Sequence, residues 1–184
     1  MLRFDLSQGF PIITTRKVSL RIAFEETMFF LRGQSNTKLL EEKKINIWKG
    51  NTSREFLDNR GLTHLPEGDM GRGYGVQWRD WLTPEKSERT GVYIAKHTDQ
   101  IKNLITGLKN DPTSRRHIVS GWNPGELDQM ALPPCHMLHM YTADTEFETD
   151  TTNGKLHNSF VMRSNDVPYG LPYNIMSYAL MHIS

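Results

Sequence analysis

The chain of 184 residues contains a single cysteine, Cys135, in the segment Ala-Leu-Pro-Pro-Cys-His of residues 131–136. Two arginine-bearing segments stand before and after it, with Arg115 and Arg116 upstream and Arg163 downstream. The thiolate is the reactive form of cysteine, and nearby guanidinium groups stabilise it. We therefore interpret Cys135 as a nucleophile that attacks an electrophilic carbon beside an anion site. The alternative is a small core residue, since free cysteines are commonly buried.

Glu26 is the second residue whose surroundings indicate chemistry. It belongs to a stretch with helical spacing of apolar residues, 18–31. Its neighbours three and four positions away are all apolar: Ile22, Ala23, Phe29 and Phe30. Burial without a charge partner raises the pKa of a carboxylic acid, which suits proton exchange near neutral pH. Glu25, in contrast, is expected to pair with Arg21 one turn earlier. The alternative for Glu26 is a structural hydrogen bond to a buried backbone group.

The elements that position these residues follow from periodicity and turn signals. We expect helices at 18–31, 98–108 and 172–182, strands at 117–122, 137–143 and 156–162, and an extended segment at 4–15. Gly33 is placed to cap the first helix. The segment 34–77 is rich in glycine and polar residues, which predicts a long, functional surface loop. Residues 144–152 are acidic and threonine-rich, which predicts a solvated hairpin excursion.

Composition limits the class of protein. With 37% hydrophobic residues, the chain can form one substantial core. Lysine and arginine number 22 against 21 acidic residues, so the net charge of +1 predicts no general attraction to nucleic acid or membrane. The absence of a long apolar run and of a signal-peptide pattern predicts a cytoplasmic protein without disulfides. Histidines are scattered, so no metal site is expected.

Eight short motifs follow one another along the chain. They are GFPIITT (9–15), IW (47–48), YGVQWR (74–79), RRHIVS (115–120), WNP (122–124), MALPPCH (130–136), RSND (163–166) and GLPYNI (170–175). In this order the motifs resemble the thymidylate synthase family. The resemblance implies an α/β (α+β) fold, with a mixed β-sheet covered by helices. It also implies one catalytic domain over residues 1–184 that is incomplete at both ends, lacking the family's N-terminal phosphate loop and its C-terminal part.

The activity implied by this resemblance is conversion of dUMP to dTMP. The co-substrate would be 5,10-methylenetetrahydrofolate, which supplies a one-carbon unit and a hydride. Cys135 matches the nucleophile that adds to carbon 6 of uracil, and Glu26 matches the glutamate that handles protons. Tyr74 matches a tyrosine with a supporting part near the nucleophile. Asn174 matches the asparagine that reads the uracil N3 and O4 edge.

The resemblance also implies the residues that bind the two substrates. Those for dUMP are Arg115, Arg116, Arg163, Ser164, Asn165, Asp166 and Asn174, and those for folate are Asp166, Trp48, Leu132 and Gly170. Guanidinium groups match phosphate oxygens, which supports the arginines. Successive strand positions face opposite sides, so Arg115 and Arg116 are expected in a loop. In the family this pair reaches the phosphate of a partner subunit, which predicts a homodimer.

Two departures from the family pattern keep alternatives open. Met162 stands where glutamine is usual, and Arg72-Gly73 stands where Pro-Val is usual. The sequence around Met162 resembles that of phage pyrimidine hydroxymethylases, so a dUMP 5-hydroxymethylase is the second interpretation. Asn174 argues against a cytosine substrate, because the dCMP enzymes of the family carry aspartate there. A third interpretation is an inactive fragment that binds nucleotide or forms dimers.

Overall fold

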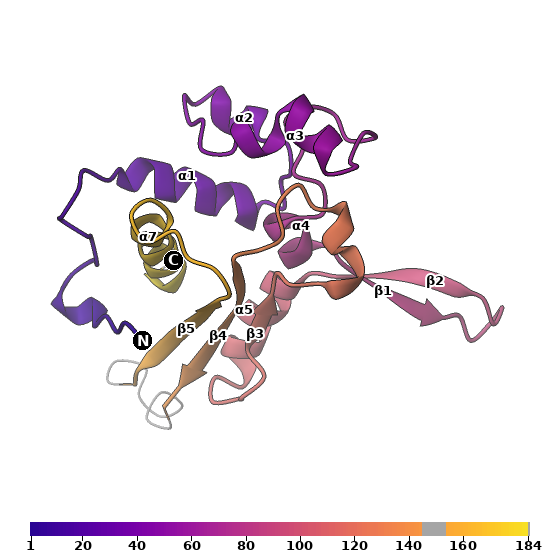
Figure 1. The fold of residues 1–184 in the computed structure, drawn as a ribbon. Helices are drawn as coiled ribbons and strands as arrows, with labels where there is room; N and C mark the ends of the chain where they lie inside the picture. The colour runs from indigo at the N-terminus through magenta and orange to yellow at the C-terminus, as the bar shows by residue number, and fades with distance from the viewer. Residues whose placement is uncertain (145–153, 184) are drawn as a thin grey trace.

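A computed structural model describes residues 1–144 and 154–183 (Figure 1). The helices are α1 (Leu20–Leu31), α2 (Lys38–Glu41), α3 (Arg54–Asn59), α4 (Tyr74–Arg79), α5 (Gln100–Asn110) and α7 (Gly170–Ile183), with short 3-10 helices η1 (Leu6–Gln8), η2 (Gly50–Thr52) and η3 (Pro124–Gln129). The strands are β1 (Trp81–Lys86), β2 (Tyr93–Thr98), β3 (Ile118–Ser120), β4 (His136–Ala143) and β5 (Leu156–Met162). The predicted α+β class is confirmed. Apart from Asp144, the excursion predicted at 144–152 lies outside the described residues.

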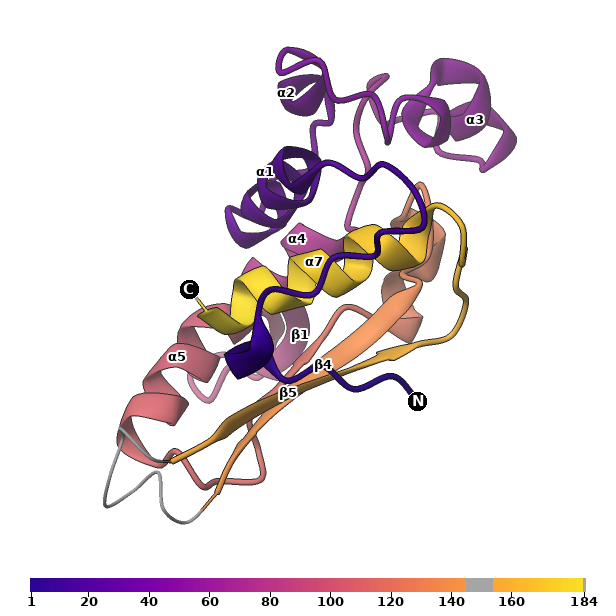
Figure 2. The same ribbon diagram turned by 90° about the vertical axis from the view of Figure 1, so that its left-hand side faces the viewer.

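The central sheet has the order β3-β4-β5. Its side chains alternate between two faces. Val119, His139 and Tyr141 are buried on one face, whereas Ile118 and Val161 are exposed on the other. Figures 1 and 2 show α1, α4 and α7 on the same side of this sheet. The main core therefore lies between these helices and the inner sheet face.

All strand pairing among the described residues is antiparallel, whereas the family resemblance led us to expect a mixed sheet. Neighbouring strands of each sheet are also consecutive in the chain. They do not need the helical crossover that parallel strands require. None of the described helices is long and apolar enough to cross a membrane.

Helix α1 begins two residues later than predicted and ends as predicted, with Gly33 in the left-handed region at φ +68°. It packs directly on α4 at Gly75. A Cβ added at Gly75 would lie 2.7 Å from the carbonyl oxygen of Phe30, so only glycine permits this approach. The close contact brings Tyr74 and Trp78 onto the ring of Phe30, which starts the aromatic layer of the core.

The prediction of a surface loop at 34–77 is wrong. The segment contains α2, η2, α3 and the start of α4, and it buries Leu40, Leu57 and Leu62. The prediction failed because helices of four to six residues are too short to show a 3.6-residue period. The abundant glycines are in part helix ends, such as Gly61 at φ +76°.

The hairpin β1–β2 was not predicted from the sequence. It extends away from the body of the molecule in Figure 1 and forms a sheet of its own. A turn signal, Thr90-Gly91, precedes the β-forming run of residues 92–94, and this signal could have revealed it. The following helix is predicted to start at Thr98, but that residue ends β2. The helix instead starts after Asp99, whose carboxylate accepts a hydrogen bond from the Lys102 amide.

The first nineteen residues are extended apart from η1, in line with the predicted extended segment. Figure 2 shows this segment running along α7. Arg16 connects this N-terminal segment to the residues that directly precede α7. Its guanidinium donates a hydrogen bond to the carbonyl of Pro168 and lies 4.6 Å from the ring centre of Tyr169.

Candidate active site

Cys135 lies half-buried at the point where a loop enters β4. This loop is held by residues 70–72. The Arg72 amide donates to the carbonyl of Gln129 at 3.1 Å, and the Ala131 amide donates to the carbonyl of Met70 at 3.0 Å. Gly71 between them has φ +65°, and a Cβ there would lie 2.1 Å from the Gln129 oxygen. The loop that carries Cys135 is therefore fixed to the segment that leads into α4.

Tyr74, the first residue of α4, contacts Cys135, the predicted nucleophile, directly. Its hydroxyl oxygen accepts a hydrogen bond from the backbone amide of Cys135 at 2.7 Å. Burial raises the pKa of Tyr74 well above its usual value, so the phenol stays protonated. The structure thus brings together Tyr74 and Cys135, as their predicted roles require.

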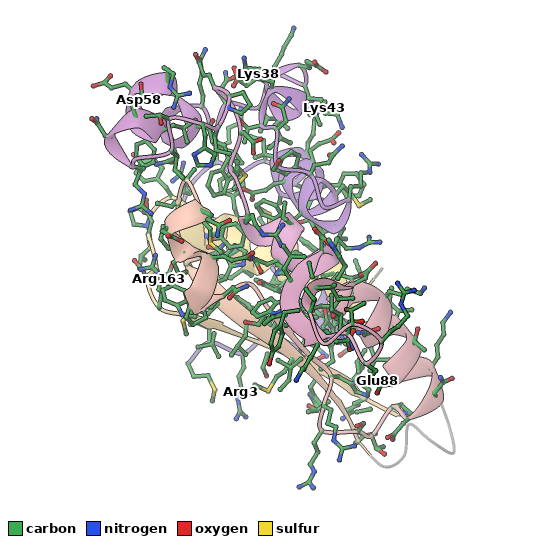
Figure 3. The ribbon with its side chains drawn as sticks, turned by 90° about the vertical axis from the view of Figure 1, so that its right-hand side faces the viewer. Arg3, Lys38, Lys43, Asp58, Glu88 and Arg163 are labelled. Atoms are coloured by element: carbon green, nitrogen blue, oxygen red, sulfur yellow. The ribbon has the colours of Figure 1, made fainter. Side chains whose placement is uncertain are left out.

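Arg163, labelled in Figure 3, lies against the same loop. Its Nε and Nη2 donate to the carbonyls of Pro134 and Pro133, each at 2.9 Å. Its backbone amide donates to the carbonyl of Cys135, also at 2.9 Å. The guanidinium carbon is 5.4 Å from the ring centre of Trp122, a cation-π distance. A positive charge is therefore held beside the cysteine loop.

Glu26 faces the site from α1. The indole nitrogen of Trp48 donates to its Oε1 at 2.7 Å. Burial raises the pKa of Glu26 to about 7, and the Trp48 hydrogen bond acts in the opposite direction. The raised pKa expected from the apolar neighbours is thus present. The expected pairing of Glu25 with Arg21 is wrong, because Glu25 pairs with Lys43 at 2.5 Å and Arg21 instead donates to the Lys43 carbonyl.

A small cavity connects α1, β4 and α7. Its apolar lining comes from Phe30, Trp78 and Met181, and its polar lining side chains are Glu26, Thr27, His136, Asn174, Ser177 and Tyr178. Its volume is about that of one water molecule. The Ser177 hydroxyl is buried and has no hydrogen-bond partner among the described residues. The predicted proton carrier, Glu26, and the predicted uracil reader, Asn174, therefore line the same small cavity, whose walls are largely apolar.

The turn before α7 carries the remaining predicted ligands. Ser164, Asn165 and Asp166 are exposed. The Asp166 carboxylate accepts a hydrogen bond from the Tyr169 amide at 3.0 Å, which shapes the turn. A Cβ added at Gly170 would lie 3.4 Å from the Cβ of Asp166, an ordinary van der Waals contact, so the turn itself does not require glycine there.

The structure does not bring Arg115 and Arg116 to Cys135. Both are exposed in the loop before β3, as the argument from alternation predicted. Ile118 pairs with Met140, five residues along β4 from Cys135. At about 3.4 Å per residue this separates the arginine loop from the cysteine by roughly 17 Å or more. Within one chain the pair is too far away to share the site.

Two residues of the site were missed by sequence reasoning. His136 follows Cys135 in the chain, and its ring stacks on Tyr74 with centres 4.1 Å apart. Its Nδ1 is 2.7 Å from the hydroxyl of Tyr178. Tyr178 lies four residues after Asn174 on α7, and this spacing on one helix face was the available signal. Trp48 and Leu132, the predicted folate walls, are both half-buried.

Comparison with known proteins identifies the family of the chain. A family model described as Thymidylate synthase matches residues 1–183. The chain is 47% identical over 180 residues to a protein of Paramecium tetraurelia, 43% over 180 residues to one of Zea mays and 45% over 181 residues to one of Plasmodium chabaudi. Each is named bifunctional dihydrofolate reductase-thymidylate synthase.

The three matches cover 98% of this chain but 37%, 33% and 29% of the relatives, so the chain spans about a third of their length. The family model itself covers nearly every residue of the chain. The chain therefore belongs to the thymidylate synthase family.

Proposed function

We propose that the protein methylates dUMP to dTMP, with 5,10-methylenetetrahydrofolate as donor of the one-carbon unit and the hydride. The observation that carries the proposal is the attachment of the Cys135 loop to both Tyr74 and Arg163 in a chain of this family. A cysteine whose loop holds a cation, and whose neighbour His136 lines a small cavity, suits addition of its thiol to an electron-poor ring.

In the proposed reaction Cys135 forms a bond from its sulfur to carbon 6 of uracil, which places negative charge on the O4 enolate. Carbon 5 then bonds to the methylene unit of the folate. Loss of the carbon 5 proton and of tetrahydrofolate leaves an exocyclic methylene group. A hydride from tetrahydrofolate reduces this group, and release of the Cys135 sulfur gives dTMP and dihydrofolate. Glu26, with a pKa near 7, suits the proton transfers, and Asn174 would read N3 and O4.

Phosphate binding would combine groups from two subunits. Arg163, Ser164 and Asn165 would bind it from one chain, and the partner subunit's Arg115 and Arg116 would complete the site. The open face of the β3-β4-β5 sheet supports a homodimer, since it exposes 49% of Ile118 and 42% of Val161. Apolar side chains on an uncovered sheet face fit a second copy of the same face.

Folate would lie over the nucleotide at the rim of the site. Asp166 would accept hydrogen bonds from the pterin, as well as bind at the dUMP site. Trp48 and Leu132 would form apolar walls. Gly170 would let the folate approach the backbone closely, because glycine has no side chain.

The experiment is incubation of the purified chain with 5-fluoro-dUMP and methylenetetrahydrofolate, followed by intact-mass measurement. Fluorine at carbon 5 cannot leave as a proton does, so the covalent ternary complex accumulates. We expect a mass increase equal to both ligands, and no increase for Cys135→Ser. An unshifted mass in folded, dimeric wild-type protein would contradict the proposal.

A dUMP 5-hydroxymethylase is the second candidate, favoured by Met162 at the end of β5, opposite His136. In that reaction water adds to the exocyclic methylene in place of the hydride. The two candidates differ in the folate product. Formation of dihydrofolate supports methylation, and tetrahydrofolate with 5-hydroxymethyl-dUMP supports hydroxymethylation. Nucleotide binding or dimer formation with neither product would indicate the inactive fragment.

A further inference from the structure

Three buried groups lie in a row behind Cys135. The Tyr178 hydroxyl contacts His136 Nδ1 at 2.7 Å. The His136 ring lies nearly flat on Tyr74, with an interplanar angle of 20°. Tyr74 in turn accepts the amide hydrogen of Cys135. Tyr178 is thus linked to the nucleophile through two aromatic side chains.

The protonation of this pair follows from its burial. Burial lowers the pKa of His136 to about 3, with a smaller contribution from neighbouring His139, so the ring is neutral near pH 7. Burial also raises the pKa of Tyr178 well above its usual value, so its hydroxyl keeps the proton. A neutral imidazole carries one N–H and one acceptor nitrogen. The contact with Tyr178 therefore decides which ring nitrogen of His136 is the donor and which is the acceptor.

The surroundings of Tyr178 favour donation from the hydroxyl. Its ring stacks on Phe160 with centres 4.1 Å apart and lies 5.3 Å from His139. Among the described residues, His136 Nδ1 is the one hydrogen-bond partner of the Tyr178 hydroxyl. If Nδ1 carried the hydrogen, the phenol hydrogen would have no acceptor among the described residues, and a buried donor without an acceptor costs about 1–3 kcal/mol. Nδ1 is therefore the acceptor, and the hydrogen resides on Nε2.

We propose that Tyr178 is a positioning residue that holds His136 as the Nε2–H tautomer, flat against Tyr74, so that this N–H donates into the cavity shared with Glu26 and Asn174. His136 lines that cavity, and the unpartnered Ser177 hydroxyl shows that the cavity can take a further polar group. The hydrogen bond that Nδ1 accepts thus leaves the ring proton on Nε2, which can then act as a donor. The effect on turnover rests on the proposed function, whereas the tautomer does not.

The direct test is nitrogen NMR of ¹⁵N-histidine-labelled protein without substrate. The His136 signals are identified by their loss in His136→Gln. We expect Nδ1 to show the shift of an acceptor nitrogen and Nε2 that of a protonated one. Tyr178→Phe should move both shifts toward a mixture of tautomers. Tyr141→Phe is the matched control, since it removes another buried hydroxyl on the sheet side of α7, and it should leave both shifts unchanged.

A protonated Nδ1 in the wild type, or unchanged shifts in Tyr178→Phe, would overturn the proposal. Kinetics supply the second test. Tyr178→Phe should lower kcat about tenfold, which corresponds to about 1.4 kcal/mol, and should change KM less than threefold. In the His136→Gln background it should have no further effect, because Tyr178 acts through His136.

A full tenfold loss in the His136→Gln background would show a structural role instead and overturn the proposal. Urea unfolding of both Phe variants checks that they are folded to a similar extent. If every form lacks turnover, the proposed function fails, and the NMR result still decides the tautomer.

Discussion

The aromatic layer behind Cys135 and the hairpin β1–β2 use apolar side chains in opposite ways. Phe30 is 4% exposed and lies within 6.4 Å of five other rings, including Tyr74 and His136. In the hairpin, Tyr93 is 67% exposed and Ile94 is 53% exposed. An isolated two-stranded hairpin gains little stability from its own side chains. The geometry of the site therefore depends on the packed layer, and the hairpin is supported chiefly at its base.

That base is polar and partly buried. Arg72 pairs with Glu126 at 2.8 Å and with Asp80 at 3.4 Å, and Asp80 also contacts His97 of β2. Gln77 and Asn123 donate to the same Glu126 carboxylate. Arg72 thus links the hairpin to η3, which leads into the loop that carries Cys135. The departure from Pro-Val noted at Arg72-Gly73 has a structural role in this chain.

The largest expected effect comes from opening the aromatic layer. Phe30→Ala should lower the free energy of unfolding by about 3–5 kcal/mol, because it leaves a cavity among packed rings. Phe24→Ala on the same helix is the control, since Phe24 is 48% exposed and should cost less than about 1 kcal/mol. Urea unfolding measures both. Similar losses for the two variants would contradict the dominance of the buried layer.

A smaller effect is expected at the hairpin base. Arg72→Ala leaves Glu126 without its cation, and we expect a loss of about 2 kcal/mol, less than for a fully buried pair because 19% of the Arg72 side chain is exposed. Lys96→Ala breaks an ion pair with Glu85 that is half-exposed on both sides, and it should cost below about 0.5 kcal/mol. Thermal and urea unfolding measure the loss of stability in the two variants. Equal losses would show that burial of the Arg72 ion pair does not increase its contribution to stability.

The contrast also explains what sequence patterns could predict. The helix at 20–31, the last helix and the strands at 136–143 and 156–162 were located within a few residues. Each is long enough to show its period, and Gly33 marks a helix end. Apolar neighbours of Glu26 on one helix face likewise indicated its raised pKa. These features depend on residues close in the chain.

Features that depend on distant residues were not accessible in this way. His136 and Tyr178 are 42 residues apart, and their hydrogen bond exists only because α7 packs over β4. The pairing of Glu25 with Lys43 bridges 18 residues and replaced the local pair with Arg21. Short helices between 34 and 77 are stabilised by burial in the fold, which their own composition does not show.

The smallest expected effect of a substitution near neutral pH concerns the buried histidines of the aromatic layer. Burial lowers the pKa of His136 and of His139 to about 3 from 6.5. Between these values the unfolded chain binds protons that the folded chain does not, so the free energy of unfolding falls as pH falls from about 6.5 toward 3. The slope reaches at most about 1.4 kcal/mol per pH unit for each histidine.

His139→Phe tests this assignment, because both ring nitrogens of His139 are buried and lack hydrogen-bond partners among the described residues. Replacing the ring by an apolar one should raise the free energy of unfolding at pH 7.5 by about 1 kcal/mol and make the decline toward pH 5.5 shallower. His97→Gln in the hairpin is the control, since that imidazole is 62% exposed and stays in contact with water in the folded protein. The opposite result would be a shallower fall of the free energy of unfolding toward acid pH in His97→Gln but not in His139→Phe. The pH dependence would then arise at the hairpin base, and the layer behind Cys135 would not be the acid-sensitive region of the molecule.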